Sequence, residues 1–189
     1  MENTVKECGD NMTLFVLLQH PLDRFLSGYI DKCHYEIYLW NESERCFGCK
    51  HDMRCFVERI HTLFARYANG NGTKQISRME YQHLRHFAPQ TWFCEFAQYK
   101  DSCILIHYQS DRDGLIKLAD ALHKVLERAQ VPAATLKHIH EELLEGSTRH
   151  IAQNSGLKRT VTQQLLSDDY VMRMLIHIYF YDFVEFGFG

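Results

Sequence analysis

Residues 13–29 read TLFVLLQHPLDRFLSGY, and this stretch decides the fold. Its first half is an apolar run with the length of one buried strand, and Pro21 then suits the first turn of a helix. Beyond Pro21, apolar side chains recur with helical period and share one face: Leu22, Phe25, Leu26, Tyr29, Ile30 and Cys33. A buried strand that leads directly into a helix predicts an α/β fold, and such a turn is a common place to hold an anion.

The opposite face of the same helix carries Arg24, Ser27 and Asp31. Arg24 and Ser27 are three residues apart and therefore point the same way. Free backbone amides in the first turn would add to the attraction for a negatively charged group. Two interpretations remain open from the pattern alone, namely an ordinary solvated helix face and a phosphate-binding site.

Apolar periodicity predicts the remaining elements. We expect a second buried strand over 103–108, and helices over 53–67, over 115–129, from Val131-Pro132 to about Leu144, and after a capping residue Ser167. Strands that alternate with helices predict a parallel sheet, which must be small because few strands are available. A length of 189 residues with 46% hydrophobic side chains fits one domain with a real core.

Charge excludes one class of partner. The formal net charge of -3 gives no general attraction to nucleic acid or to an anionic membrane surface. Any anion-binding site must therefore be local, and we expect no nucleic-acid partner.

Sequons and cysteines indicate an oxidising lumen. Asn11, Asn41 and Asn71 each begin an Asn-X-Ser/Thr sequon, whereas this composition would give roughly half a sequon by chance. The chain is therefore expected to be a glycoprotein. It has 7 cysteines, and we expect most of the following five to form disulfides: Cys33, Cys46, Cys49, Cys55 and Cys94.

A zinc site is the alternative for part of this cysteine cluster. Cys46, Cys49, His51 and Cys55 could supply four ligands, but they crowd into one short segment. Zinc modules usually separate two close pairs by a longer loop. Disulfides are therefore favoured, and no metal is expected.

The N-terminal segment does not fit the lumenal assignment. Residues 1–12 are polar and partly acidic, unlike a signal peptide, and no apolar run approaches the roughly 20 residues that a membrane helix needs. We therefore expect a membrane anchor upstream of Met1, absent from this chain. A fragment, a truncated gene model or a decayed paralogue would each explain its absence.

Several ordered motifs resemble a known family. Residues 15–33 resemble the segment of carbohydrate O-sulfotransferases that binds the 3′-phosphate of 3′-phosphoadenosine-5′-phosphosulfate, in which Arg-Asp-Pro is followed by Arg-Phe and Ser-Gly-Tyr. Residues 85–94 resemble the family's His, Pro-Gln and Cys stretch, and residues 178–187 resemble its aromatic, Asp and Phe-Gly ending. Together with the Cys46–Cys55 segment, these motifs are most similar to a nematode-type expansion of the family.

This resemblance implies a fold and a function. The fold would be a partial P-loop-like sulfotransferase fold, a single domain over 1–189 with a small parallel sheet flanked by helices. The chain would move sulfate from the phosphosulfate donor to a glycan hydroxyl, with a chondroitin-like chain as one acceptor, in the Golgi lumen or membrane. Arg24 and Ser27 would bind the 3′-phosphate. His86 is the candidate general base because imidazole titrates near neutral pH, and its alternative role is a hydrogen bond within the fold.

Two departures from the family pattern support a competing interpretation. Gln19 and His20 stand where the family has its first arginine and the acid that follows, and a neutral amide cannot replace a bidentate guanidinium on a phosphate. The twelve residues before Thr13 also leave no room for the family's phosphosulfate loop. The alternative function is a non-catalytic lumenal pseudoenzyme or a glycan-binding partner of an active paralogue.

Overall fold

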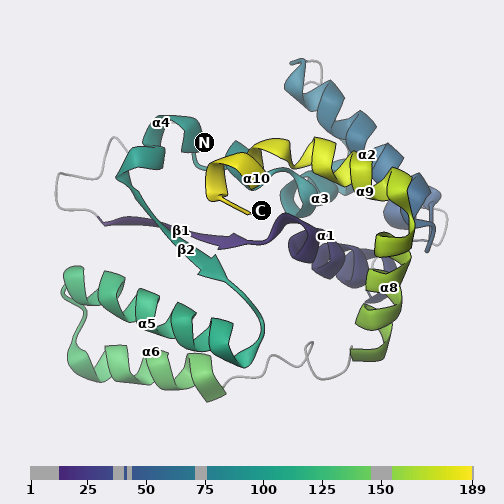
Figure 1. Ribbon diagram of the computed structural model, residues 1–189. Coiled ribbons are helices and arrows are strands. Elements are labelled where there is room, and N and C mark those ends of the chain that lie inside the picture. Colours follow the sequence, from purple (N-terminus) through teal and green to yellow (C-terminus); the bar gives the residue numbers. More distant parts are fainter. Residues whose placement is uncertain (1–12, 36–40, 42–43, 71–75, 146–154, 189) are drawn as a thin grey trace. The chain divides into compact units, whose positions relative to one another are not determined.

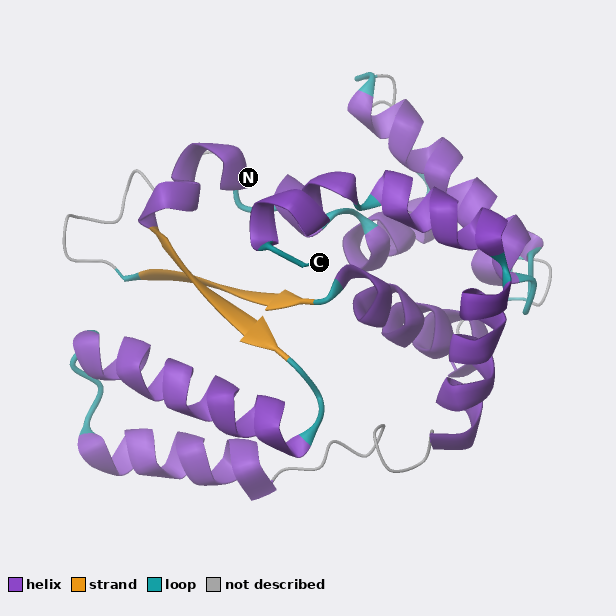
Figure 2. Ribbon diagram, in the orientation of Figure 1, coloured by secondary structure: helices purple, strands orange, loops and turns teal. Residues whose placement is uncertain are grey.

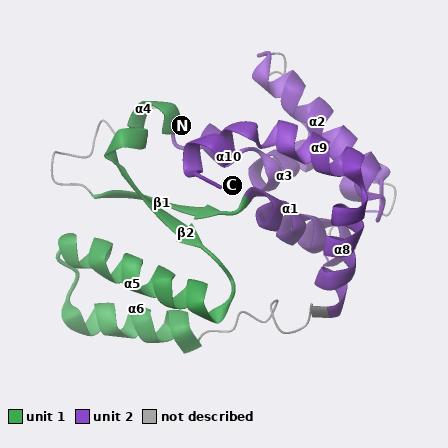
Figure 3. Ribbon diagram, viewed as in Figure 1, with its two compact units in different colours: residues 1–20, 95–148 green, residues 21–94, 149–189 purple. Residues whose placement is uncertain are grey.

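The computed structural model describes residues 13–35, 41, 44–70, 76–145 and 155–188 (Figure 1). The chain forms two compact units, which Figure 3 distinguishes by colour. The first unit comprises residues 1–20 and 95–148, and the second comprises residues 21–94 and 149–189. The chain therefore passes from the first unit to the second directly after strand β1 and returns at Glu95.

A small parallel sheet lies in the first unit (Figure 2). Strand β1, Leu14–Gln19, pairs in parallel with β2, Cys103–Tyr108, so that Leu14 lies opposite Cys103 and Gln19 lies opposite Tyr108. Helix α4, Phe96–Tyr99, and a 3₁₀ turn, Lys100–Ser102, lead into β2. Both predicted strands, the parallel pairing and the α/β class are confirmed.

Two helices complete the first unit: α5, Arg112–Arg128, and α6, Ala133–Glu145, which lie side by side as a hairpin (Figure 1). Helix α5 packs on β2 through a core that includes Ile106, Leu118 and Val125. Asp111 caps α5 by accepting a hydrogen bond from the Gly114 amide at 2.7 Å. A Cβ atom at Gly114 would overlap with Gln109, which explains the glycine.

The second unit is helical in its described residues. Its elements are α1 (Pro21–Tyr29), a π-helical turn (Ile30–Tyr35), a 3₁₀ turn (Arg45–Gly48), α2 (Met53–Ala68), α3 (Arg78–Phe87), a 3₁₀ turn (Gln90–Trp92), α8 (Ser155–Ser167), α9 (Asp169–Ile178) and α10 (Phe180–Phe186). The predicted helices at α1 and α2 are confirmed. The predicted cap Ser167 is wrong by one residue, because Asp168 accepts the amides of Tyr170 and Val171 at the start of α9.

Aromatic side chains form the centre of the second unit. Phe25, Tyr29, Phe56 and Phe87 are each fully buried, and the rings of Phe56 and Phe87 meet edge to face at 5.0 Å. A Cβ atom at Gly28 would lie only 2.9 Å from the Phe87 ring, so glycine allows α1 and α3 to approach closely. This approach brings the segment after α3 to the polar side of α1.

Two disulfides close the start of the second unit. Cys33 pairs with Cys46, and Cys49 pairs with Cys55. The expectation that most of the five cysteines form disulfides is therefore confirmed, with the exposed free thiol of Cys94 as the exception. Because three of the four candidate zinc ligands are consumed by these bonds, the zinc alternative for this cluster is wrong.

Two further expectations concern the glycosylation sites and membrane-spanning helices. Asn41 is exposed, whereas Asn11 and Asn71 lie outside the described residues. None of the described helices combines the length and the apolar character that crossing a membrane requires.

Candidate functional site

The guanidinium of Arg24 is held in a fixed position by the segment that follows α3. Its Nη1 atom donates to the carbonyl oxygen of Ala88 at 2.8 Å, and the group lies 5.9 Å from the centre of the Phe93 ring. No second hydrogen bond holds this guanidinium among the described residues. The remaining N–H groups can therefore donate to a ligand.

Arg24 is a partly buried cation whose charge is not neutralised by a direct ion pair among the described residues. Burial lowers the pKa of Arg24 below its ordinary value, while Tyr179 and Asp182 act in the opposite direction. The group still carries its charge at neutral pH, because arginine titrates far above that range. An oriented, partly desolvated guanidinium is a strong partner for a phosphate oxygen.

Asp182 fixes the turn on which Arg24 depends. Its carboxylate is fully buried in α10 and accepts the amide of Gln90 at 2.7 Å and that of Thr91 at 2.9 Å. The Thr91 hydroxyl donates a further bond at 2.9 Å. Asp182 thus uses its oxygens on this turn, and Arg24 keeps its charge available for a ligand.

Tyr179 holds the start of the same segment. It is fully buried at the junction of α9 and α10, and its hydroxyl donates to the Phe87 carbonyl at 2.8 Å. Burial raises the pKa of Tyr179, so the hydroxyl remains a donor throughout the physiological range. Residues 87–91 are therefore hydrogen-bonded to Tyr179 at one end and to Asp182 of α10 at the other.

Ser27 lies on α1 one turn after Arg24. It is exposed and makes no hydrogen bond within the described part of the chain. The predicted solvated face of α1 is thus present at Ser27, but the Arg24 guanidinium turns towards Ala88. The structure places both residues in the second unit, and their binding of a phosphate stays a prediction.

The candidate base His86 lies in the last turn of α3, two residues before Ala88, and is partly buried. His83, one turn earlier, is buried among Phe47, Phe56 and Phe87 at ring distances of 4.5, 5.4 and 5.8 Å. Burial lowers the pKa of His83 to about 4, with His86 and Lys32 adding to the effect. His83 is therefore a neutral core residue, and the role of His86 as the base stays a prediction.

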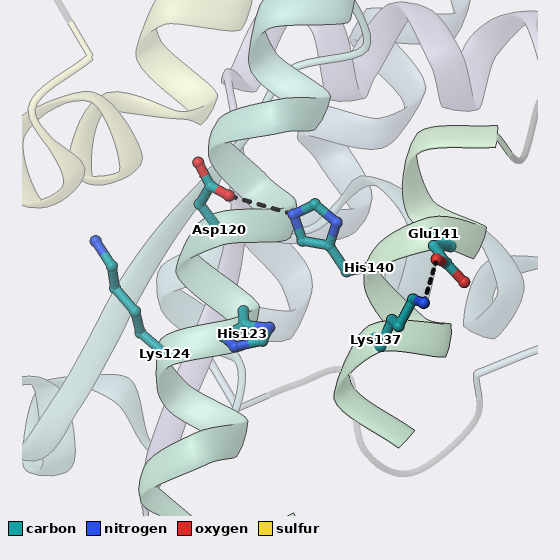
Figure 4. A pocket seen from close by; sticks show the side chains of 6 residues that line it. All are labelled: Asp120, His123, Lys124, Lys137, His140 and Glu141. Carbon is teal, nitrogen blue, oxygen red and sulfur yellow. Dashed lines mark hydrogen bonds and ion pairs between the residues drawn. The ribbon is translucent and has the colours of Figure 1, made fainter. Parts of the chain in front are cut away.

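A separate hollow of about 420 Å³ lies between α5 and α6 in the first unit. Each helix contributes an acid, a histidine and a lysine at helical spacing: Asp120, His123 and Lys124 from α5, and Lys137, His140 and Glu141 from α6 (Figure 4). His140 approaches Asp120 at 3.3 Å, and Lys137 approaches Glu141 at 3.7 Å. The formal charges of the two acids and the two lysines cancel, so these four side chains give an anion no net attraction.

Comparison with known proteins gives the family. A model described as "Sulfotransferase family" matches residues 2–189, nearly the whole chain. The chain belongs to the sulfotransferase family. Carbohydrate sulfotransferase chst-1 of Caenorhabditis elegans is 30% identical over 174 residues, which cover 92% of this chain and 51% of that protein. The protein vep-2 of the same species, named as a candidate sulfotransferase, is 30% identical over 144 residues, which cover 76% of this chain and 42% of vep-2.

This sulfotransferase-family chain thus spans about half the length of the curated relatives it matches. No solved structure gives a significant match. The predicted resemblance to nematode carbohydrate sulfotransferases is confirmed.

Sequence reasoning assigned no structural role to three buried residues of the second unit: Asp182, Tyr179 and His83. Asp182 is the only acid in the run IYFYDFV, and an isolated acid among aromatic residues is a signal of a buried, hydrogen-bonded carboxylate. Tyr179 and His83 offered no such signal, because tyrosine and histidine occur both inside and outside folded proteins.

Proposed function

We propose that this chain is part of a carbohydrate O-sulfotransferase that moves a sulfuryl group from 3′-phosphoadenosine-5′-phosphosulfate to a glycan hydroxyl. The observation that carries the proposal is the Arg24 guanidinium, oriented by Ala88 and Phe93 with donors still available. The match of the family model to residues 2–189 supports the reaction class.

Arg24 and Ser27 would hold the 3′-phosphate of the donor. A fixed guanidinium can donate two parallel hydrogen bonds to one phosphate, and the exposed Ser27 follows Arg24 by one turn of α1. The residues present therefore fit a phosphate ester. The hydrogen bonds from Asp182 and Tyr179 fix the segment that contains Ala88. Because Arg24 donates to Ala88, its guanidinium would keep the same position with or without the ligand.

His86 would act on the acceptor. In the transfer, an acceptor oxygen forms a bond to sulfur, the bond from sulfur to the donor phosphate oxygen breaks, and the acceptor hydroxyl loses its proton. A neutral imidazole can take that proton at near-neutral pH. His86 lies in the last turn of α3, two residues before Ala88, whose carbonyl oxygen binds Arg24. This proximity to Arg24 in the fold supports His86 as the candidate base.

We further propose a chondroitin-like acceptor and the Golgi lumen as the place of action. Two disulfides and an exposed sequon asparagine, Asn41, support an oxidising lumen.

The alternative function is a non-catalytic pseudoenzyme or a glycan-binding partner of an active paralogue. Gln19 supports it, because the family pattern has arginine at this position and an amide lacks the charge.

A transfer assay separates the two functions. The full chain, expressed through a secretory pathway, is incubated with radiolabelled donor and a panel of unsulfated glycans. We expect label on at least one glycan, and a loss of roughly a hundredfold in Arg24→Ala and in His86→Ala. The exposed Arg59→Ala on α2 serves as the matched control. Nucleotide binding without transfer to any glycan would favour the pseudoenzyme, and full activity of both variants would reject the site assignment.

A further inference from the structure

An exposed pair of aromatic rings adjoins the candidate site. Trp92 ends the 3₁₀ turn Gln90–Trp92, and Tyr67 lies in the last turn of α2. Their rings stack on each other, at an angle of 21° and a centroid distance of 5.9 Å, and the two residues are 38% (Tyr67) and 40% (Trp92) exposed. Phe64, which is buried, packs edge to face with the Trp92 ring at a centroid distance of 5.6 Å.

The support of Trp92 is rigid. Its own amide donates to the Pro89 carbonyl at 3.0 Å, and the preceding residue Thr91 is bound twice by Asp182. The residue that follows, Phe93, lies under the Arg24 guanidinium. The turn thus presents Arg24 and Trp92 from one fixed piece of backbone.

Rigid, exposed aromatic rings are suited to binding by stacking. A ring that is already fixed loses little conformational entropy when a ligand covers it, and the covered apolar surface stabilises the complex. One face of a pyranose ring is flat and carries mainly C–H groups, which pack against an indole or phenol ring while the hydroxyls stay hydrated.

We propose that the stacked pair of Trp92 and Tyr67 forms a platform, whose solvent-exposed ring surface packs against a sugar ring of the acceptor glycan. This inference rests on the proposed function, because it takes the acceptor to be a carbohydrate. Continuity with Arg24 through residues 91–93 would place the platform beside the donor phosphate site. Its openness to solvent suits a glycan chain, which must lie across a surface.

The adenine ring of the donor is the other flat ligand of this reaction, and fluorescence distinguishes the two. The chain has two tryptophans, Trp40 and Trp92, so Trp40→Phe leaves Trp92 as the reporter. The full chain in this background is titrated with unsulfated hexasaccharides of chondroitin, heparosan and chitin, and separately with 3′-phosphoadenosine-5′-phosphate. We expect at least one hexasaccharide to change the Trp92 emission saturably.

Calorimetry on the original chain then measures affinity. We expect Trp92→Ala and Tyr67→Ala each to weaken hexasaccharide binding about tenfold, with nucleotide affinity unchanged and Trp92→Phe intermediate. Tyr81→Ala on α3, which removes another exposed ring, is the matched control and should bind as the original chain does.

Each other outcome overturns the inference. Equal hexasaccharide binding by Trp92→Ala and the original chain rejects the platform and leaves the proposed function standing. A nucleotide that alone changes the emission, and that binds Trp92→Ala weakly, assigns the ring to adenine. If Trp92→Ala loses affinity for both the hexasaccharide and the nucleotide and also melts at a lower temperature, Trp92 stabilises the fold and does not bind the glycan. An original chain that binds no hexasaccharide contradicts the inference and the carbohydrate acceptor together.

Discussion

Asp182 accepts two hydrogen bonds from Thr91, one from its amide and one from its hydroxyl, each at 2.9 Å, across 91 residues of sequence. With the Gln90 amide as a third donor, this fully buried carboxylate has good partners for its charge. The C-terminal helix α10 therefore determines the position of the turn that carries the candidate site.

Replacing Asp182 should destabilise the fold strongly. In Asp182→Asn, the carboxamide NH₂ must face backbone donors, so we expect the free energy of unfolding to fall by about 2 to 4 kcal/mol. Thr91→Val is the matched variant, because it removes only the hydroxyl bond and should cost about 1 kcal/mol. Urea unfolding measures both, and equal costs would show that the charge of Asp182 contributes nothing.

His83 should make the protein acid-sensitive. The pKa of His83 is about 4 in the folded chain and about 6.5 when unfolded, so the unfolded state binds a proton first as the pH falls. Stability is then fully present above pH 6.5 and is lost towards pH 4, by about 3 kcal/mol for this residue. Burial also lowers the pKa of His34 to about 4, with His51 and Arg45 contributing, so its effect has the same sign.

The variant His83→Phe tests this origin of the pH dependence. It keeps a ring against Phe47, Phe56 and Phe87 but cannot titrate. Chemical unfolding between pH 7.5 and 4.5 should show a flatter dependence for the variant than for the original chain. Parallel curves would mean that His83 does not cause the acid sensitivity.

The two disulfides should differ in their contribution to stability. The Cys33–Cys46 bond spans 13 residues and the Cys49–Cys55 bond spans 6. A disulfide stabilises the fold by restricting the unfolded chain, and more so for a longer loop. We therefore expect the free energy of unfolding to fall by about 3 kcal/mol when Cys33 and Cys46 are both replaced by serine, and by about 2 kcal/mol when Cys49 and Cys55 are. Thermal unfolding gives the order, and peptide mapping should find both bonds with Cys94 open to alkylation. Free thiols at all four positions in secreted protein would contradict the pairing.

Glycosylation tests the compartment. Asn41 is exposed, so a glycan can attach there without burial, and Asn71 is the second expected site. Glycosidase treatment of protein from a secretory host should lower the mass by at least two glycans, and Asn41→Gln should remove one of them. An unchanged mass would remove the lumenal assignment.

The spacing of apolar residues in the sequence correctly predicted several strands and helices. The apolar runs of β1 and β2 and the stripe of α2 identify those elements, because burial on a strand or helix imposes a period. The break between α9 and α10 at Tyr179 has no glycine or proline to mark it. It coincides with the hydrogen bond of the Tyr179 hydroxyl to Phe87, which is a tertiary contact.

In the candidate site, too, the sequence pattern predicted some features, whereas contacts between distant residues determine others. The helix period correctly places Ser27 on the exposed side of α1, but Arg24 turns inwards because of Ala88, which is 64 residues away. The cysteine count predicts disulfides, yet the pairing depends on how the π-helical turn meets the Arg45–Gly48 turn. Contacts between distant residues therefore set the parts that the sequence pattern could not give.

The most direct test of the account is calorimetry with 3′-phosphoadenosine-5′-phosphate. We expect weak binding by the original chain, because Gln19 stands where the family pattern has a charged residue. Arg24→Ala should lower that affinity a further tenfold to hundredfold, about the value of one charged hydrogen bond, while the control Arg59→Ala binds as the original chain does. Nucleotide binding that is tight and unchanged by Arg24→Ala would contradict the assignment of Arg24 to the donor phosphate.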